Sequence, residues 1–461
     1  PEQALLEEER LLAEDRLKWY QEAKFGLFIH WGPYSVAGVE ASWPIMAPEL
    51  AAALFGDSPP ISEAEYVALP QRFNPVDFEP GAWVRLAKQA GMRYIVFTAK
   101  HHDGFCMFDA PGTDYKITRT PYGRDVCAEL AKACAEAGMH LCFYYSPPDM
   151  HHPGYRDTNK LAVENWLGEP QRPELADYLD YMEGHVRKLL TDYGPVSAIW
   201  FDGLAGHKKY DPARFHRLIH ELSPGTLVND RLGPEYDFCT PEQYIPRRGI
   251  PVKHKSSAPS DAQFRTILSL VKVPGVGLLL KRLARRYGEG DLSLTSLPTA
   301  SYPSPERFQP WETCMTMNRT WAYNPADTQY KPAGQLLLFL VEVASRGGNY
   351  LLNVGPSPQG TLPPEAVERL QAIGRWMAIN GESIHGTTYG PMQHLLYGRT
   401  TATENRIYVH IWDWPASGEI SLGAMPGTVS SVALLGGEPS LPFKQRGIHF
   451  TIQVPRQAPQ P

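Results

Sequence analysis

The stretch VSAIWFDG, residues 196–203, decides how the rest of the chain is interpreted. Its apolar run is too short for a helix, follows the turn pair Gly194-Pro195 and ends at Gly203, so it predicts a buried strand. Asp202 then places an ionisable carboxylate where this strand meets a turn. Taken alone, an aspartate before a glycine is common turn chemistry. The other segments of the chain therefore decide whether Asp202 has a function.

Further segments repeat this pattern of a short apolar strand that ends in polar or aromatic side chains. They are residues 25–32, 94–99, 141–145, 226–231, 236–242, 311–317 and 350–356. Helical patterns lie between and after them, at residues 83–90, 126–137, 178–193, 212–222, 334–346 and 364–380. Alternating strands and helices favour a parallel sheet, and eight strands predict an α/β fold closed into a (β/α)8 TIM-like barrel. The carboxyl ends of its strands form one mouth, where catalytic groups are found.

The chain is expected to contain two domains. Residues 1–385 hold the barrel, preceded by an amphipathic helical pattern over residues 2–24. From about residue 386 onward, short alternating runs separated by turn residues predict a small antiparallel β-sandwich over residues 386–461. A chain of 461 residues is long enough for both.

Residues 247–303 interrupt the alternation of strands and helices. Between residues 247 and 290, ten Lys or Arg stand against two acids, with leucines and valines beside them. We interpret this segment as an insertion that packs on the rim of the barrel. The alternative is an amphipathic basic helix that lies on a membrane or an anionic partner.

The composition limits the class of protein. A net charge of −6 and a pI near 6.2 argue against a nucleic-acid-binding protein. Aromatic residues reach 11% against 20% charged residues, which suits stacking on sugars as well as a large core. The six cysteines lack zinc-ligand spacing, and no apolar run reaches the roughly 18 residues of a membrane span. Because the chain starts at Pro1 and not at Met, the sequence leaves open whether a signal peptide has been removed. Between the two locations, export (periplasmic or secreted) is slightly favoured over the cytoplasm.

Polar and aromatic side chains at the predicted strand ends form the candidate site. They are His30, His101, His102, Tyr145, Trp200, Asp202, Arg231, Glu242 and Glu312. The carboxylates are the strongest chemical candidates, because the chain has no GxSxG elbow, no Walker loop and no GxGxxG after a strand. Two carboxylates around a pocket, with His and Arg for hydroxyls and Trp for an apolar sugar face, suit glycoside hydrolysis.

The adjacent His101 and His102, with an aspartate nearby, also raise the question of a metal site. Neighbouring residues on a strand point to opposite faces, so both rings reach one side only if the strand bulges. A second HxH pair and a late Asp or Lys ligand are also missing from the sequence. We therefore expect no metal and no other cofactor. A metal-dependent barrel hydrolase, which a chelator would inactivate, is kept as an alternative.

Several motifs, in order along the chain, resemble one known family. They are KFGLFIHWG (24–32), AKHHDGF (99–105), IWFDG (199–203), NDR (229–231), WETC (311–314), NVGP (353–356) and NGESI (380–384). From about residue 18 to its end, the chain resembles the α-L-fucosidases of glycoside hydrolase family 29. The resemblance implies a barrel with a C-terminal β-sandwich. It also implies exo-acting, retaining removal of terminal α-L-fucose from fucosylated oligosaccharides or glycoconjugates, without a cofactor.

The resemblance implies roles for single residues. Asp202 matches the family nucleophile. The fucose-binding positions match His30, His101, His102, Tyr145, Trp200 and Arg231, and Trp43 matches the aromatic residue that completes the pocket. The chain departs from the family pattern at Ser42, where an acid is usual, and at Pro310, where a lysine is common. These departures leave the linkage preference open.

The general acid has two candidates in this sequence. Glu242 follows the predicted sixth strand and Glu312 opens the seventh, and family members have acids that align with each. We favour Glu242, because a loop carboxylate can approach the leaving oxygen from the side, whereas a strand-borne carboxylate such as Glu312 is better placed for substrate hydroxyls. The alternative functions are a fucose-binding barrel without activity and a different retaining glycosidase. A homo-oligomer is left open, and neither nucleic acid nor a membrane is expected as a partner.

Overall fold

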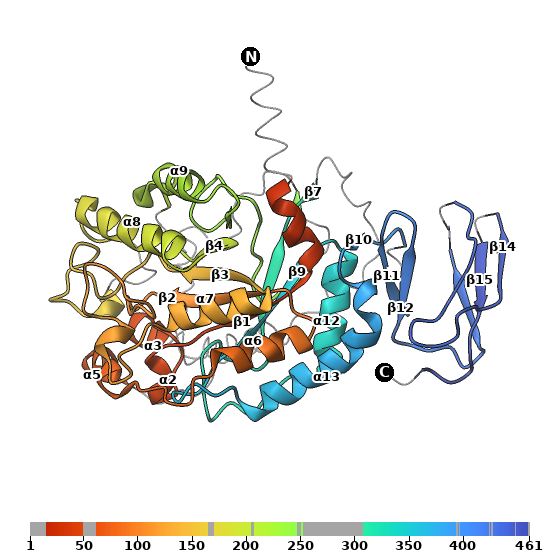
Figure 1. Ribbon diagram of the computed structural model, residues 1–461, viewed down its shortest axis with the longest axis horizontal. Coiled ribbons are helices and arrows are strands. Elements are labelled where there is room, and N and C mark those ends of the chain that lie inside the picture. Colours follow the sequence, from red (N-terminus) through yellow and green to blue (C-terminus); the bar gives the residue numbers. More distant parts are fainter. Residues whose placement is uncertain are drawn as a thin grey trace, which may run out of the picture.

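The computed structural model describes most of the chain (Figure 1). The described residues are 15–48, 61–164, 170–203, 207–246, 250–251, 308–392, 395, 397–423, 425, 427–447 and 449–459. The basic insertion predicted over residues 247–303 lies outside them, except for residues 250–251. Of the predicted N-terminal helix, residues 15–23 are described, and they are helical.

A parallel sheet of seven strands forms the centre of the larger region. In spatial order it consists of β5 (Leu227–Val228), β4 (Ala198–Phe201), β3 (His140–Tyr145), β2 (Tyr94–Lys100), β1 (Phe25–Ile29), β9 (Asn349–Val354) and β8 (Glu312–Thr316). Every neighbouring pair is parallel. Nearly all of these residues are buried, as expected for strands that are covered on both faces.

The segment that follows β5 closes the sheet. Single parallel bridges run along this segment, from Asn229 to Phe238, from Cys239 to Trp311 and from Glu242 to Cys314. The segment predicted as a strand over residues 236–242 therefore pairs with its neighbours through isolated β-bridges, near the end of β5 on one side and along β8 on the other. It does not form a continuous hydrogen-bonded ladder. With this irregular sixth strand in place, the predicted (β/α)8 barrel is confirmed.

Helices cover the outside of the sheet (Figure 1). The longer ones are α6 (Pro80–Gln89), α7 (Val126–Ala137), α8 (Ala176–Thr191), α9 (Pro212–Leu222), α12 (Ala333–Ser345) and α13 (Pro364–Asn380), and the short ones are α2 (Tyr34–Ala37), α3 (Trp43–Met46) and α5 (Glu63–Ala68). Asp125 caps α7 by accepting a hydrogen bond from the Ala128 N–H at 2.9 Å. Gly138 ends α7 with φ of 63°, a conformation that costs glycine little. Within the described part of the chain, none of the helices combines the length and apolarity that crossing a bilayer requires.

The side chains of each strand alternate between the barrel interior and the surrounding helices. Tyr144 and Trp200 belong to the apolar cluster inside the barrel, and their Cα atoms are partners across β3 and β4. Tyr145 and Phe201 belong to the larger cluster between the sheet and the helices. The position of an aromatic residue along β3 or β4 therefore decides whether it can line the barrel mouth.

The C-terminal region contains two antiparallel sheets, of which the first lies beside α12 and α13 in Figure 1 and the second lies beyond it. The first sheet is β10 (Thr388–Tyr389), β11 (Gly398–Ala402) and β12 (Ile407–Ile411), and the second is β13 (Glu419–Leu422), β15 (His449–Gln453) and β14 (Phe443–Arg446). A further antiparallel pair, β6 (Ile250–Pro251) and β7 (Phe308–Gln309), forms a sheet of its own. A separate apolar core that includes Leu422, Phe450 and Ile452 fills this region. The predicted antiparallel C-terminal structure is confirmed.

A buried charge cluster joins the two regions. Glu342 on α12 is 2% exposed and pairs with Arg346 at 2.9 Å and with Arg399 of β11 at 2.7 Å. Because both carboxylate oxygens are paired, the charge of Glu342 is compensated inside the protein.

Candidate active site

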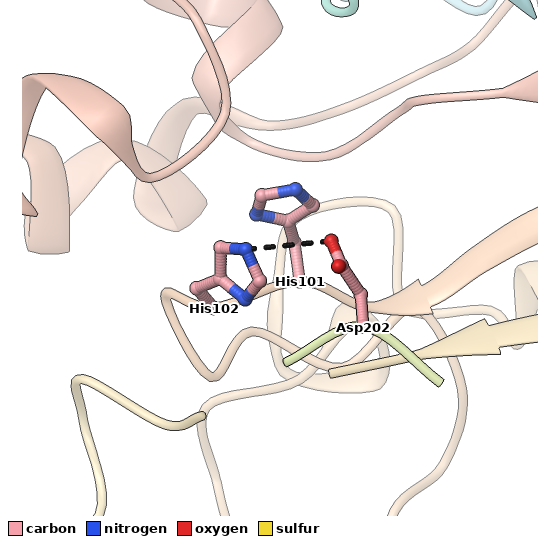
Figure 2. Close-up of side chains that lie close together, drawn as sticks. All are labelled: His101, His102 and Asp202. Carbon is pink, nitrogen blue, oxygen red and sulfur yellow. Dashed lines mark ion pairs between the residues drawn. The ribbon is translucent and has the colours of Figure 1, made fainter. Parts of the chain in front are cut away.

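Side chains from several strands converge where the strands of the barrel end. Asp202 directly follows β4, and His101 and His102 directly follow β2. His30 follows β1, and Arg231 lies shortly after β5. Figure 2 shows His101, His102 and Asp202 close together, with His102 Nε2 3.5 Å from Asp202 Oδ2. The groups expected at these strand ends therefore meet at one mouth.

Asp202 is held by donors on both of its carboxylate oxygens. Arg231 Nη1 donates to Oδ1 at 2.9 Å, and the Tyr144 hydroxyl donates to Oδ2 at 2.7 Å. Burial raises the pKa of Asp202, but the Arg231 charge, the His102 ring and the Tyr144 hydrogen bond outweigh it, so the pKa lies below its usual value. Asp202 is therefore ionised at neutral pH. Its side chain keeps 14% exposure, which leaves it accessible to a ligand.

Arg231 connects Asp202 to a second carboxylate. Its Nη2 donates to Glu242 Oε2 at 2.9 Å while its Nη1 serves Asp202. Its Nε donates to Thr240 Oγ1 at 3.0 Å, and the guanidinium lies 4.8 Å from the centre of the Trp200 ring. Because one rigid planar group bonds both carboxylates, they flank the same pocket at a restricted spacing. Glu242 is the more open of the two, with 30% of its side chain exposed.

Glu312 lies inside the barrel, at the first residue of β8. Its buried carboxylate accepts hydrogen bonds from Trp200 Nε1 at 3.0 Å and from the hydroxyl of Tyr94, the first residue of β2. Burial raises the pKa of Glu312 to about 7, although both hydrogen bonds lower it. The structure corrects the expectation that Glu312 belongs to the strand-end groups, because first residues of parallel strands lie away from the carboxyl-end mouth.

The three pocket histidines each have one ring nitrogen engaged by a buried polar side chain. The Nδ1 partners are Asn353 Oδ1 for His30 (2.6 Å), Ser42 Oγ for His101 (2.7 Å) and Ser146 Oγ for His102 (2.5 Å). Burial lowers the pKa of His101 well below its usual value and lowers the pKa of His30 and of His102 to about 4. All three rings are therefore neutral at pH 7, with Nε2 left for a ligand.

His101 and His102 also form a candidate metal-ligand group with Asp202. One ligand atom from each residue lies within 4.8 Å of the others. The register of β2 against β3 shifts near the end of β2, which is the irregularity that the two adjacent rings need in order to reach the same side. Two imidazoles and a carboxylate are a donor set that suits a transition metal. However, the Arg231 charge 2.9 Å from Asp202 opposes a cation there and favours an anionic carboxylate without one.

Tyr145 does not reach the pocket, so its expected place there is wrong. Its hydroxyl contacts His185 Nδ1 at 3.0 Å, and His185 lies on α8 outside the barrel. Tyr144 lies in the pocket instead and stacks on His101, with ring centroids 5.4 Å apart. The choice between adjacent tyrosines depends on strand parity, which the register of β3 against β4 sets by placing Tyr144 opposite Trp200.

Trp43 lies in α3, partly buried against the interior cluster that contains Tyr144 and Trp200. This position fits a wall of the pocket.

Sequence reasoning missed the partners of the three histidines. Asn353 stood within a recognised motif and Ser42 stood out as a departure from the family pattern, but neither signal pointed to a histidine partner. Ser146 carried no signal of its own, because buried serines are common and its partner lies far away in the sequence.

This combination of fold and site defines a class of protein. A (β/α)8 barrel whose mouth holds two carboxylates around one guanidinium, beside neutral histidines and a tryptophan, is the arrangement of a glycoside hydrolase. The chain belongs to the alpha-L-fucosidase family, whose model, described as Alpha-L-fucosidase, matches residues 4–265 and 286–382. The unmatched residues 266–285 fall within the predicted insertion.

Similar proteins agree with this family. An alpha-L-fucosidase isoenzyme 1 from Paenibacillus thiaminolyticus is 32% identical, with a TM-score of 0.77 over 98% of this chain and 97% of its own. The alpha-L-fucosidase of Dictyostelium discoideum is 26% identical over 96% of this chain and 89% of its own. A GH29 alpha-L-fucosidase from Bacteroides thetaiotaomicron, solved as a trapped covalent intermediate, shares the fold at 24% identity, with a TM-score of 0.73 over 96% of this chain and 94% of its own. The resemblance found from the motifs is confirmed.

Proposed function

We propose that Asp202 and Glu242 carry out the retaining hydrolysis of terminal α-L-fucosides in this chain, as nucleophile and as general acid/base. The observation that carries this assignment is the single guanidinium of Arg231, which bonds both carboxylates at 2.9 Å. A retaining glycosidase needs its two carboxyl groups about 5 to 5.5 Å apart. One guanidinium that donates from two nitrogens to two carboxylates supports a spacing of this size.

In the first displacement, an oxygen of ionised Asp202 attacks the anomeric carbon of the fucose. The bond from that carbon to the leaving oxygen breaks as the ester bond to Asp202 forms, and Glu242 gives its proton to the leaving oxygen. Arg231 and Tyr144 keep Asp202 charged and oriented before the attack, because each donates to one of its oxygens.

In the second displacement, a water molecule attacks the anomeric carbon of the fucosyl ester. Glu242 removes a proton from this water, and the bond to Asp202 breaks. Two inversions at the same carbon leave the α configuration unchanged. Glu242 suits both proton transfers because it is the more exposed of the two carboxylates, so a leaving group or a water molecule can reach it.

Glu312 has a different role in this proposal. It bonds the indole Nε1 of Trp200 and thereby fixes the ring on which the Arg231 guanidinium lies. Both oxygens of Glu312 already have donors inside the barrel, and its side chain is 1% exposed. We therefore assign Glu312 as a positioning residue and not as the general acid.

The proposed substrate is a terminal α-L-fucose unit on an oligosaccharide or a glycoconjugate, removed in the exo mode. The histidines at positions 30, 101 and 102 supply polar contacts for hydroxyls, while Trp200 and Trp43 supply apolar faces. We also propose residues 386–461 as a separate domain, a division supported by the apolar core of the C-terminal sheets.

The test of this function is the hydrolysis of an aryl α-L-fucoside, followed by proton NMR of the first sugar released. We expect hydrolysis that a chelator does not reduce, and α-fucose as the first product before mutarotation. The β-anomer as the first product would exclude double displacement. Binding of fucose without hydrolysis of any fucoside would instead support the non-catalytic alternative.

A further inference from the structure

The contacts of the three pocket histidines bear on which ring nitrogen of each carries the hydrogen. A contact of 2.5–2.7 Å between an imidazole nitrogen and an oxygen, as at His30, His101 and His102, needs one hydrogen between the two atoms. The other contacts of that oxygen decide which atom supplies the hydrogen. Since each neutral imidazole carries a single hydrogen, this choice also fixes the character of Nε2.

Ser146 determines the tautomer of His102. Its Oγ lies 2.8 Å from the carbonyl oxygen of Pro148, which has no hydrogen, so the hydroxyl proton of Ser146 must point there. His102 Nδ1 therefore supplies the hydrogen in its contact with Ser146 Oγ. Ser146 is fully buried, so water does not replace either partner. The Nε2 atom of His102 is left with a lone pair.

Ser42 determines the opposite tautomer for His101. Its Oγ accepts the backbone N–H of Asp103 at 2.8 Å, and Ser42 is fully buried. Among the described residues, the acceptor that the structure gives the Ser42 hydroxyl is His101 Nδ1. Ser42 therefore donates, and His101 carries its own hydrogen on Nε2.

The backbone holds the Ser42 hydroxyl in this place. Ser42 has φ of 60°, which a residue with a side chain rarely adopts. Its N–H donates to the Tyr66 hydroxyl at 2.8 Å, and Tyr66 in turn donates to the Asp103 carboxylate at 2.8 Å. Asp103 therefore fixes Ser42 twice. Its backbone N–H donates to the Ser42 hydroxyl, and its carboxylate holds the Tyr66 hydroxyl that accepts the Ser42 N–H.

His30 follows the same reasoning as His102. The amide nitrogen of Asn353 donates to the carbonyl oxygen of Trp321 at 2.7 Å, so Asn353 Oδ1 is the atom that faces His30. His30 Nδ1 donates to that oxygen, and its Nε2 also keeps a lone pair.

We propose that Ser42 and Ser146 are positioning residues that give the adjacent His101 and His102 opposite tautomers, so that His101 donates to the ligand and His102 accepts from it. His102 Nε2 lies 3.5 Å from Asp202 Oδ2, and neither atom carries a hydrogen (Figure 2). Two facing acceptors repel each other until a donor enters between them. This pair therefore selects a substrate hydroxyl that donates a hydrogen bond, and it discriminates against a sugar in which that hydroxyl is replaced by hydrogen.

Neutron diffraction from deuterium-exchanged, unliganded crystals tests the tautomers directly. We expect deuterium on Nδ1 of His102 and of His30, and on Nε2 of His101. Deuterium on Nε2 of His102, or on Nδ1 of His101, would overturn the proposal. This measurement uses the wild-type protein without substrate, so its outcome does not depend on the proposed function.

A binding measurement tests the consequence for the ligand and rests on the proposed function. Removing the partner of His102 in Ser146→Ala should raise the Kd for fucose by about tenfold, and Ser146→Thr, which keeps a hydroxyl, should restore it. The matched control is Ser383→Ala, since the buried Ser383 hydroxyl also donates to a carbonyl, that of Asn380 at 2.6 Å, far from the mouth. Equal fucose affinity in Ser146→Ala and Ser383→Ala would contradict the proposal. If no form of the protein binds fucose, the proposed function fails, while the neutron map still decides the tautomers.

Discussion

The Tyr144 hydroxyl donates a 2.7 Å hydrogen bond to Oδ2 of Asp202, from the strand beside the one that Asp202 follows. The next residue, Tyr145, points to the other side of the sheet and contacts His185. Two adjacent tyrosines on one strand therefore have separate tasks. One orients the proposed nucleophile, and the other packs the barrel against its helices.

This difference predicts unequal effects of removing each hydroxyl. A hydrogen bond to a charged group contributes about 1.5–3 kcal/mol, so Tyr144→Phe should lower kcat/KM for an aryl fucoside by roughly 10- to 100-fold. Tyr145→Phe, the matched control, should keep kcat/KM within about threefold of wild type, because its hydroxyl lies outside the pocket. Equal losses in both variants would contradict the placement of the two rings.

Removing the general acid should have an effect that depends on the leaving group. Glu242→Gln should slow cleavage of a fucosyl-sugar bond by roughly 10²- to 10⁴-fold and hardly slow formation of the fucosyl-enzyme from dinitrophenyl fucoside, which needs no protonation. Glu312→Gln should slow both substrates by a similar factor, because Glu312 acts through the position of Trp200. If the selective loss occurs in Glu312→Gln, the two assignments must be exchanged.

The raised pKa of Glu312 predicts a pH-dependent stability. Its value is about 7 in the folded protein against 4.5 as the ordinary value, so the folded state holds this proton more tightly than the unfolded state. Stability from this group is complete below about pH 4.5 and is lost as the pH rises through about 7. The Tm of wild type should therefore fall more between pH 5 and pH 8 than the Tm of Glu312→Gln, which cannot ionise. The same Tm change in both proteins would show that Glu312 does not titrate in this range.

The charge cluster between the barrel and the C-terminal sheets predicts a specific loss of stability. Arg399→Ala leaves the buried Glu342 with one partner instead of two, which should cost about 2 kcal/mol or more. The control is Arg406→Ala, because Arg406 pairs with Glu382 across the same two regions but both side chains are more than half exposed. Thermal unfolding should show a lower Tm for Arg399→Ala and an unchanged Tm for Arg406→Ala. Equal Tm values in the two variants would contradict a stabilising role of the buried cluster.

The barrel could be predicted from the sequence because short apolar runs alternate with helical patterns, and each run ends in a polar group. Asp202 was predictable for the same reason. Glu312 was counted among the strand-end groups although WETC opens the predicted seventh strand, and the first residue of a parallel strand lies away from the carboxyl-end mouth. The ladder between β8 and β9 confirms that Glu312 is the first residue of its strand.

Side-chain direction was harder to predict than strand position. Tyr145 was chosen instead of Tyr144, an error of one residue that exchanges the two faces of the strand. The pairing of β3 with β4 determines which of the two tyrosines faces the barrel interior. The joint orientation of His101 and His102 required a register shift near the end of β2 that has no local sequence signal. The serines that bond these rings come from loops 59 and 44 residues away in the sequence.

The most direct test of the proposed mechanism is to identify the residue that becomes covalently bound to the sugar. The protein is incubated with 2-fluoro-fucosyl fluoride, digested, and analysed by tandem mass spectrometry. The mechanism predicts one fucosylated peptide, which contains residues 198–203 and carries the label on the Asp202 carboxylate, and no label in Asp202→Gly. A label on Glu242, Glu312 or any other residue of the wild-type protein would contradict the assignment of Asp202 as the nucleophile.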